Sequence, residues 1–154
     1  MPRRPKRTPD VLLLGCVAMK LDHPAPAEEL FISPLFRARR DHAERSGLPW
    51  YVLSSHYGLL TPDQIVAPYD VPLARQPIEA RRAWGELVLT QIEGTLGDLA
   101  GVTFEVHAGS AHTDPIAPGL TDRGATVLRP LEGLSLGRHL SWYAAHRRRV
   151  RPRP

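Results

Sequence analysis

The amino-acid sequence predicts one α/β domain of three layers, with helices on both faces of a central, mostly parallel sheet of four strands. Short apolar or alternating segments, typical of strands, alternate four times along the chain with segments of helical periodicity. The connections between successive predicted strands are long enough to return the chain to the same end of a sheet, as parallel pairing requires. No internal repeat or linker interrupts this alternation.

The first half of the chain contains two predicted strands and one predicted helix. Residues 11–18 form an apolar run, which indicates a buried strand. Ser33 and Pro34 resemble an N-cap followed by proline at the first helical position, and Gly47 resembles a C-cap. We therefore expect an amphipathic helix between them. Residues 50–53 are aromatic and aliphatic, which predicts the second strand.

The second half repeats the alternation with two strands and three helices. Residues 77–99 carry apolar side chains at helical spacing and form the longest predicted helix. Residues 103–107 alternate in polarity, as a third strand would. An aspartate–proline pair predicts a helix over residues 114–124, and residues 126–128 form a short fourth strand. Residues 134–148 complete the predicted elements as a final helix.

The composition is typical of a globular domain, with 154 residues of which 42% are hydrophobic and 23% charged. The lone Cys16 cannot form an internal disulfide and is typical of a reducing compartment. The apolar run before Gly15 is shorter than the core of a signal peptide, and no segment reaches the ~18 apolar residues of a membrane span. We expect a cytoplasmic protein that does not associate with membranes. The oligomeric state cannot be predicted.

The positive charge is concentrated at the two ends of the chain. Segments 1–8 and 147–154 contain nine of the 20 Lys and Arg residues, and all 16 acidic residues lie between them. We expect two disordered basic tails around a single domain at residues 9–146. Such tails either contact nucleic-acid phosphates or only keep the protein soluble. The candidate nucleic-acid-binding residues are Arg3, Arg4, Arg147, Arg148 and Arg149.

Polar loops follow the predicted strands, where ligands bind in open parallel sheets. The first strand is followed by Cys16 and Lys20. A lysine that points into a cleft can neutralise a phosphate or a developing negative charge. A cysteine at a buried strand end is more often a packing residue than a nucleophile. We place both residues near the substrate, with a structural role for the Cys16 thiol.

The loop after the second strand has a histidine in its centre. His56 can exchange a proton near neutral pH, whereas a structural histidine would only brace the turn. Asp70, further along, could stabilise a cationic intermediate or cap a turn. We expect His56 and Asp70 to be catalytic. The candidate substrate-binding residues of this region are Ser55, Tyr57, Gly58 and Tyr69.

The third strand ends at His107, which we also expect to be catalytic, and small residues follow it. Gly109 and Ser110 can expose backbone N–H groups to an anionic substrate. The spacing of His107 and His112 matches no metal-ligand motif, and only one cysteine is present, so we expect no metal. The phosphate-binding loop of NTPases, the dinucleotide-binding glycine motif and the GxSxG elbow of hydrolases are absent from the sequence. We expect no cofactor.

Several of these motifs resemble a known family. Ser55-His56-Tyr57-Gly58-Leu59-Leu60, with Pro62 and then Pro68-Tyr69-Asp70, is the most specific block. Cys16-x-x-x-Lys20-Leu21 and Ser33-Pro34-Leu35-Phe36 precede it. Together they resemble an uncharacterised bacterial and phage domain family that is distantly similar to YaaA. That resemblance implies relatives with DNA binding, oxidative-stress protection and a likeness to uracil-DNA glycosylases.

The resemblance and the polar loops lead to two hypotheses about function. The first is an enzyme that acts on a nucleobase, nucleoside or modified DNA base, most concretely an N-glycosidase. Cleavage of an N-glycosidic bond makes the sugar positive and the leaving base negative, so it needs a carboxylate and a proton donor. Asp70 and either His56 or His107 would supply them. The alternative is a non-catalytic nucleic-acid-binding protein of a stress response, and base-release assays distinguish the two.

Overall fold

The computed structural model describes residues 8–149, and the side chains of the helix-ending Arg148 and Arg149 are not described. The segments 1–7 and 150–154, which include the candidate phosphate ligands Arg3 and Arg4, lie outside the described residues. The predicted tails are therefore not tested, except where the last helix continues to Arg149. Residues 147–149, assigned above to a disordered tail, belong to that helix.

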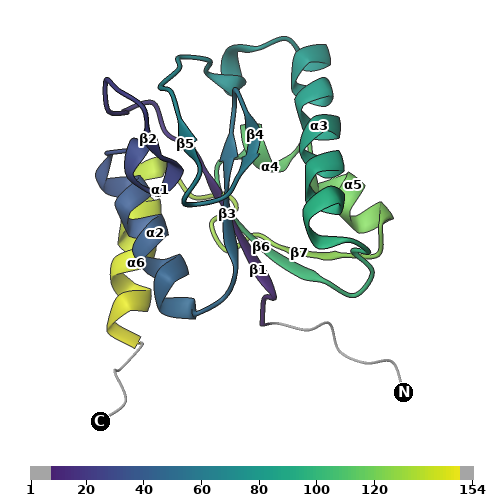
Figure 1. Cartoon of the computed structure of the whole chain (residues 1–154). Helices are drawn as coiled ribbons and strands as arrows, with labels where there is room; N and C mark the ends of the chain where they lie inside the picture. The colour runs from purple at the N-terminus through teal and green to yellow at the C-terminus, as the bar shows by residue number, and fades with distance from the viewer. Residues whose placement is uncertain (1–7, 150–154) are drawn as a thin grey trace.

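The centre of the molecule is a five-stranded sheet in the order β4-β3-β1-β6-β7. β1 (Val11–Gly15) is the central strand, and it pairs in parallel with β3 (Trp50–Ser54) and β6 (Thr103–His107). β7 (Thr126–Leu128) continues the parallel arrangement beyond β6. At the other edge, β4 (Gly58–Leu60) pairs antiparallel with β3. The four predicted strands are all present, and the order reverses at β1, as in doubly wound sheets (Figure 1).

The prediction of four strands was wrong, because β4 makes a fifth. β4 is only three residues long, and a tight turn at residues 55–57 joins it to β3. Three residues are too few for a recognisable alternation of apolar and polar side chains. A second, two-stranded sheet of β2 (Ala25–Pro26) and β5 (Ile65–Val66) was missed for the same reason.

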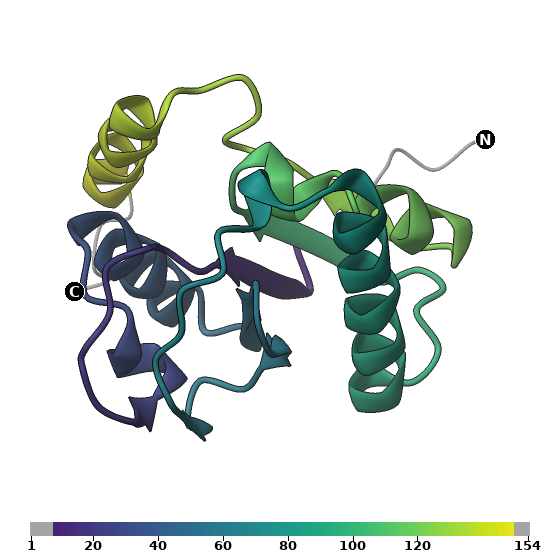
Figure 2. The same ribbon diagram turned by 90° about the horizontal axis from the view of Figure 1, so that it is seen from above.

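Helices cover both faces of the sheet, which confirms the α/β class (Figures 1 and 2). One face is covered by α3 (Ile78–Leu96) and α5 (Ala117–Asp122), beside the short α4 (Ser110–Thr113). The other face is covered by α1 (Ala27–Leu30), α2 (Pro34–Ser46) and α6 (Leu136–Arg149). A short 3-10 helix, η1 (Leu73–Arg75), precedes α3.

The alternating side chains of β1 divide the core between these two layers. Leu13 points into the cluster that contains Val88 and Ile92 of α3. Leu12 and Leu14 point the other way, into the cluster that contains Phe36 of α2. All six side chains are buried, so the period of two along β1 builds a core on each face of the sheet.

The ends of α2 form as the sequence predicts. The Ser33 side-chain oxygen accepts a hydrogen bond from the backbone N–H of Phe36 at 3.1 Å, and Pro34 is the first helical residue. Gly47 ends the helix at a φ of 69°, a left-handed conformation that glycine adopts without steric cost. These caps fix the position of the α2 side chains that face the sheet.

The helix predicted over residues 114–124 differs from the prediction. Asp114 ends the short α4 instead of capping a helix, and α5 begins at Ala117. The backbone of Pro115 packs so closely on Gly85 of α3 that a Cβ there would lie 2.5 Å from the proline carbonyl oxygen. Packing against α3 therefore decides where this segment turns. Within residues 8–149, no helix is both long and apolar enough to cross a membrane.

Candidate functional site

A cavity of about 630 Å³ opens at the carboxyl ends of the parallel strands. The loops after β1, β3 and β6 meet there, as expected for a sheet whose strand order reverses at β1. Apolar residues such as Met19, Leu35, Leu73 and Leu140 form much of its wall. The polar and small residues at the cavity include Cys16, Lys20, Ser33, Arg39, Ser55, Asp70, Gly109 and His112. Its size suits a small organic molecule.

Cys16 and His112 form the central polar contact of this cavity. The Cys16 Sγ atom lies 3.4 Å from Nε2 of His112, and the backbone N–H of Ser55 donates to the same sulfur at 3.4 Å. The thiol also lies 3.7 Å from the Ser55 Oγ atom. The sulfur therefore sits between a histidine ring and two groups of the loop after β3.

These contacts favour the thiolate form of Cys16. Burial by itself would raise the pKa of the thiol, but the His112 ring opposes it by a hydrogen bond and by its charge. Hydrogen bonds from Tyr69 and from the Ser55 backbone act in the same direction, and the pKa of Cys16 falls to about 6. A thiolate is the nucleophilic form of cysteine, so a large share of Cys16 is reactive at neutral pH.

A buried cation lies behind the thiol. Arg39 of α2 is only 2% exposed, and its Nη1 atom donates to the carbonyl oxygen of Gly15 at 2.9 Å. Burial lowers the pKa of Arg39, whereas charge on Tyr143 and on Cys16 raises it. Among residues 8–147 no carboxylate lies within 4.0 Å of this guanidinium. The Cys16 thiolate is therefore a natural counter-ion for Arg39.

The turn after β3 holds the other side of the site. The Ser54 hydroxyl donates to the Tyr69 hydroxyl at 2.8 Å and accepts from the backbone N–H groups of His56 and Tyr57. Trp84 of α3 donates from its indole N–H to the Ser54 carbonyl at 2.8 Å, and its ring meets the His112 ring edge to face. Ser54 and Trp84 thus connect the turn to the Cys16 and His112 pair.

Lys20 and Asp70 complete the charged groups of the cavity. The Lys20 ammonium lies 4.6 Å from the centre of the Tyr69 ring and donates to the Ala18 carbonyl at 3.1 Å. Asp70 lines the cavity and is exposed to solvent. The burial of Tyr69 and the charge of Cys16 raise the pKa of the Tyr69 hydroxyl, so it stays protonated and can donate.

The three predicted catalytic residues do not converge on this cavity. Of these three, Asp70 lines it. His56 is exposed and stacks on the Tyr69 ring at 5.3 Å, outside the lining of the cavity. His107 is fully buried and points to the α2 and α6 side of the sheet, where it contacts Glu105 and Tyr143. A residue at the carboxyl end of a strand can project from either face of the sheet, so its position in the sequence does not place its side chain in the cavity.

The predicted substrate-binding residues divide in a similar way. Cys16, Lys20, Ser55 and Gly109 line the cavity, whereas Ser110 faces a different hollow. Tyr57 donates from its hydroxyl to the Ala67 carbonyl at 3.1 Å. Gly58, at a φ of 81°, packs against the Gln91 side chain, so its lack of a Cβ serves the β3–β4 turn rather than a ligand. Arg147 is exposed on α6 and lies 3.7 Å from Asp41.

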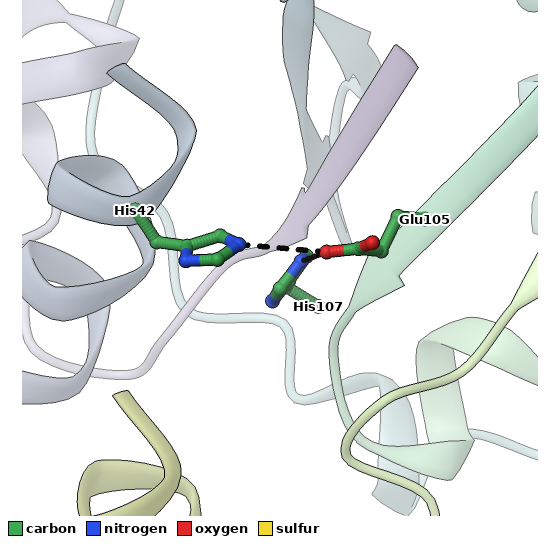
Figure 3. A group of neighbouring side chains, drawn as sticks. All are labelled: His42, Glu105 and His107. Atoms are coloured by element: carbon green, nitrogen blue, oxygen red, sulfur yellow. Dashed lines mark hydrogen bonds and ion pairs between the residues drawn. The ribbon is translucent and has the colours of Figure 1, made fainter. Parts of the chain in front are cut away.

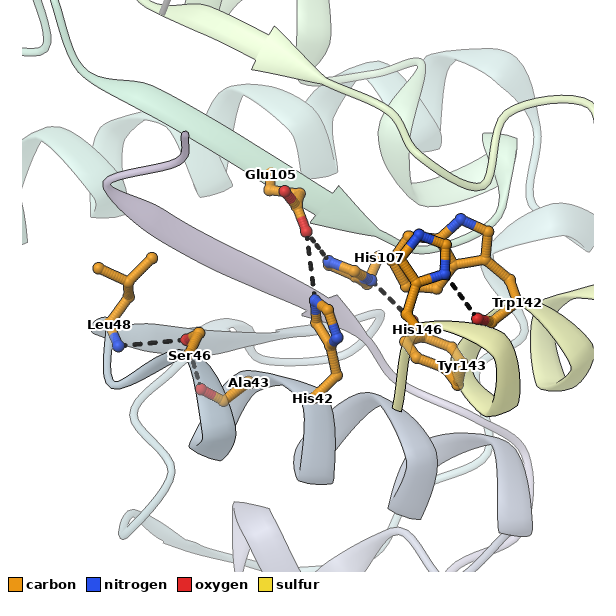
Figure 4. Close-up of polar contacts among 9 residues, drawn as sticks. All are labelled: His42, Ala43, Ser46, Leu48, Glu105, His107, Trp142, Tyr143 and His146. Atoms are coloured by element: carbon orange, nitrogen blue, oxygen red, sulfur yellow. Dashed lines mark hydrogen bonds and ion pairs between the residues drawn. The ribbon is translucent and has the colours of Figure 1, made fainter. Parts of the chain in front are cut away.

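His107 belongs to a second polar cluster on the α2 and α6 face. The Nε2 atoms of His107 and His42 lie 2.6 Å and 3.5 Å from the same Glu105 carboxylate oxygen (Figure 3). Burial alone would raise the pKa of Glu105, but the hydrogen bonds from His107 and His42 bring it to about 2. Burial in turn lowers the pKa of His107. Figure 4 shows the aromatic residues of α6 beside this cluster.

Sequence reasoning missed His112 and Arg39 as site residues. His112 was considered only as a metal ligand, and Arg39 lies within the predicted amphipathic helix without having been singled out. A signal for His112 was present, since it follows the third strand by five residues and therefore lies near the carboxyl edge. No local pattern distinguishes Arg39 from its neighbours, because its burial depends on β1 packing against α2.

Fold and site together define an α/β protein of the doubly wound type, with a cysteine–histidine pair at the carboxyl edge of its sheet. The chain belongs to the family of unknown function DUF6884, whose model matches residues 11–145. A search among curated proteins found no match. The family description names no activity, so the resemblance to YaaA stays a prediction.

Proposed function

We propose that this protein is an enzyme that uses the Cys16 thiolate as a nucleophile on a small substrate in the carboxyl-edge cavity. The observation that carries the proposal is the 3.4 Å contact between Cys16 Sγ and His112 Nε2. A nucleophile and a base within hydrogen-bond reach form the basic unit of covalent catalysis by cysteine. The sequence favoured a structural role for Cys16, and the geometry supports the nucleophilic alternative.

The arrangement supports a two-step transfer at an electrophilic carbonyl carbon. The thiolate attacks the carbon, and the leaving group departs with a proton from the His112 ring. Water then attacks the thioester while His112 takes its proton, which releases the acid and restores the thiolate and the protonated His112. Arg39 and the Ser55 N–H stabilise the thiolate between turnovers. Trp84 holds the His112 ring by its edge-to-face contact.

The cavity supports a substrate with a largely apolar body and a polar end. Met19, Leu35 and Leu140 contribute apolar surface to its lining, and Lys20 and Asp70 contribute opposite charges. Lys20 would neutralise an acidic group of the substrate. The Asp70 carboxylate would accept hydrogen bonds from an amine or a hydroxyl.

The test uses a generic acyl donor, p-nitrophenyl acetate, with the full chain. We expect a burst of nitrophenol and an acetyl group on Cys16 by peptide mass spectrometry. Cys16→Ser should abolish the burst, and His112→Gln should slow it by about 100-fold or more. Ser110→Ala is the matched control, because Ser110 is exposed and outside the cavity. Equal nitrophenol release from wild type and Cys16→Ser would overturn the proposal.

A second candidate function is the N-glycosidase activity predicted from the sequence. It is supported by the position of Asp70, a carboxylate on the wall of a cavity large enough for a nucleoside. In this mechanism Asp70 stabilises the positive charge on the sugar, and His112 replaces His56 and His107 as the proton donor to the base.

The two candidates differ in the residue on which turnover depends. Single-turnover base release should be measured from modified DNA, unmodified DNA and free nucleosides. Asp70→Asn should reduce release by roughly 100-fold while binding is retained, and Cys16→Ser should have little effect. If no substrate releases a base, the glycosidase candidate fails. Binding of DNA without release would support the non-catalytic nucleic-acid-binding alternative.

A further inference from the structure

We propose that His42, Glu105 and His107 bind a divalent transition-metal ion, with Zn²⁺ as the best match. The site lies on the α2 and α6 face of the sheet, and the proposal does not depend on the chemistry of Cys16. Each of the three side chains offers one ligand atom, and these atoms all lie within 4.8 Å of one another. Figure 3 shows all three side chains converging from α2 and β6.

The convergence follows from the secondary structure. Glu105 and His107 are two residues apart on β6, so their side chains leave the same face of the sheet. His42 reaches them from α2, which packs on that face beside α6. Neighbouring elements hold all three residues, so the site does not depend on a mobile loop.

The distances between ligand atoms are close to those that zinc requires. Bonds of 2.0–2.1 Å in a tetrahedral site separate the ligand atoms by about 3.3 Å. The Glu105 oxygen lies 3.5 Å from His42 Nε2 and 2.6 Å from His107 Nε2. Binding of the ion requires the shorter contact to open, and the ligand nitrogens of the two histidines lie within 4.8 Å of each other. Two imidazoles and one carboxylate suit zinc and its neighbours, whereas Mg²⁺ and Ca²⁺ prefer oxygen ligands alone.

Tyr143 of α6 supplies the outer partner that metal-binding histidines use. Its hydroxyl lies 2.7 Å from Nδ1 of His107, on the opposite side of the ring from Glu105 (Figure 4). Metal-bound histidines donate their second N–H to an oxygen acceptor, most often a carboxylate, a backbone carbonyl or water, which fixes the tautomer and the ring orientation. A tyrosine hydroxyl can accept this hydrogen bond, and without metal it can donate instead. Tyr143 is therefore a positioning residue for the site.

Metal binding replaces a proton. Without metal, the 2.6 Å contact between His107 Nε2 and the Glu105 oxygen holds one shared proton. When the ion binds Nε2, the ring proton moves to Nδ1, where it is donated to the Tyr143 hydroxyl, and the ion takes its place between the Nε2 atom and the Glu105 oxygen. A hollow of about 890 Å³, lined by His42 and Glu105, connects the site with solvent. Water from this hollow can fill the coordination position that the three side chains leave open.

The structural alternative is a hydrogen-bonded cluster that only fastens α6 to the sheet. The two interpretations differ in metal affinity. Chelator-treated full-length protein should be titrated with ZnCl₂ by calorimetry in the Cys16→Ser background, which removes the thiolate as a competing ligand. We expect one equivalent to bind with a Kd of micromolar or tighter. Co²⁺ should give a visible spectrum without a thiolate charge-transfer band.

Variants of the cluster then decide between the interpretations. His42→Gln, at a side chain that is 26% exposed, should weaken Zn²⁺ binding by at least 100-fold without loss of the folded state. Tyr143→Phe should weaken it by roughly 10- to 100-fold. His23→Gln is the control, because His23 is exposed and pairs with Asp22. Circular dichroism confirms folding of each variant.

Two results would overturn the proposal. The first is that the Cys16→Ser protein binds no Zn²⁺ while it is folded. The second is that it binds Zn²⁺ equally well with and without the His42→Gln substitution. Either result would leave the cluster with a structural role only.

Discussion

The Sγ atom of Cys16 lies 3.4 Å from Nε2 of His112, although 96 positions separate the two residues in the chain. The contact forms because β1 and β6 are neighbours in the sheet, and both residues follow the carboxyl ends of those strands. Adjacent parallel strands thus bring the thiol and the imidazole together. The reactivity of Cys16 follows from this pairing.

The first prediction concerns thiol reactivity. Because the pKa of Cys16 is about 6, its alkylation by iodoacetamide should reach half of its maximal rate near that pH. His112→Gln removes the imidazole charge and should move the midpoint upward by at least one pH unit. Mass spectrometry of the labelled peptide measures the rate. A midpoint between 8 and 9 in the wild type would show an ordinary thiol.

The second prediction concerns stability as a function of pH. The folded-state pKa of Cys16 lies below 9.0, the ordinary value for a cysteine thiol, so ionisation of Cys16 stabilises the fold. The stabilisation of the fold by the Cys16 thiolate is complete above pH 9, and it is lost as the pH falls toward 6. Between pH 6.5 and 8.5, wild type should gain about 1 kcal/mol per pH unit over Cys16→Ser. Urea unfolding of both proteins under reducing conditions tests this, and parallel pH profiles would contradict it.

The third prediction concerns the glycine that precedes Cys16. A Cβ at Gly15 would lie 2.7 Å from the Ala108 Cβ and 3.3 Å from its Cα, so β1 and the end of β6 would have to separate. Gly15→Ala should therefore destabilise the fold by about 1–3 kcal/mol. It should also slow Cys16 alkylation at neutral pH, because the thiol moves away from His112.

Gly94→Ala is the matched control for Gly15→Ala. Gly94 lies in α3, and a Cβ there would meet no atom within 4 Å. Alanine at an open helical position should stabilise the fold by about 0.5–1 kcal/mol. Chemical denaturation of the two variants should give changes of opposite sign. If Gly15→Ala is as stable as the wild type, the packing of Gly15 against Ala108 leaves room for a Cβ, which contradicts the prediction.

The fourth prediction concerns the basic ends of the chain. Removal of residues 1–7 and 150–154 deletes Arg3, Arg4 and four other positive charges. If these ends bind nucleic acid, affinity for DNA should fall and its dependence on salt should flatten. The boundaries spare α6, which continues to Arg149. Fluorescence anisotropy at several salt concentrations measures both quantities, and an unchanged salt slope would mean that the ends only improve solubility.

The sequence alone determined the alternation of strands and helices and the caps of α2. It also placed Cys16 at the end of a buried strand. These features depend on neighbours within a few residues: the period of two in β1, the Ser33 and Pro34 pair, and the glycine at position 47. Such patterns are local, so they can be recognised before any tertiary contact is known.

Only the tertiary structure decided which polar residues meet. The pairing of Cys16 with His112, the burial of Arg39 beneath Gly15 and the convergence of His42 with Glu105 all join distant segments. Each contact depends on the order of the strands in the sheet and on the face of the sheet from which a side chain projects. A single local pattern is compatible with several strand orders, and each order would bring different side chains together. The position of the candidate site at the carboxyl edge was therefore predictable, but its chemical groups were not.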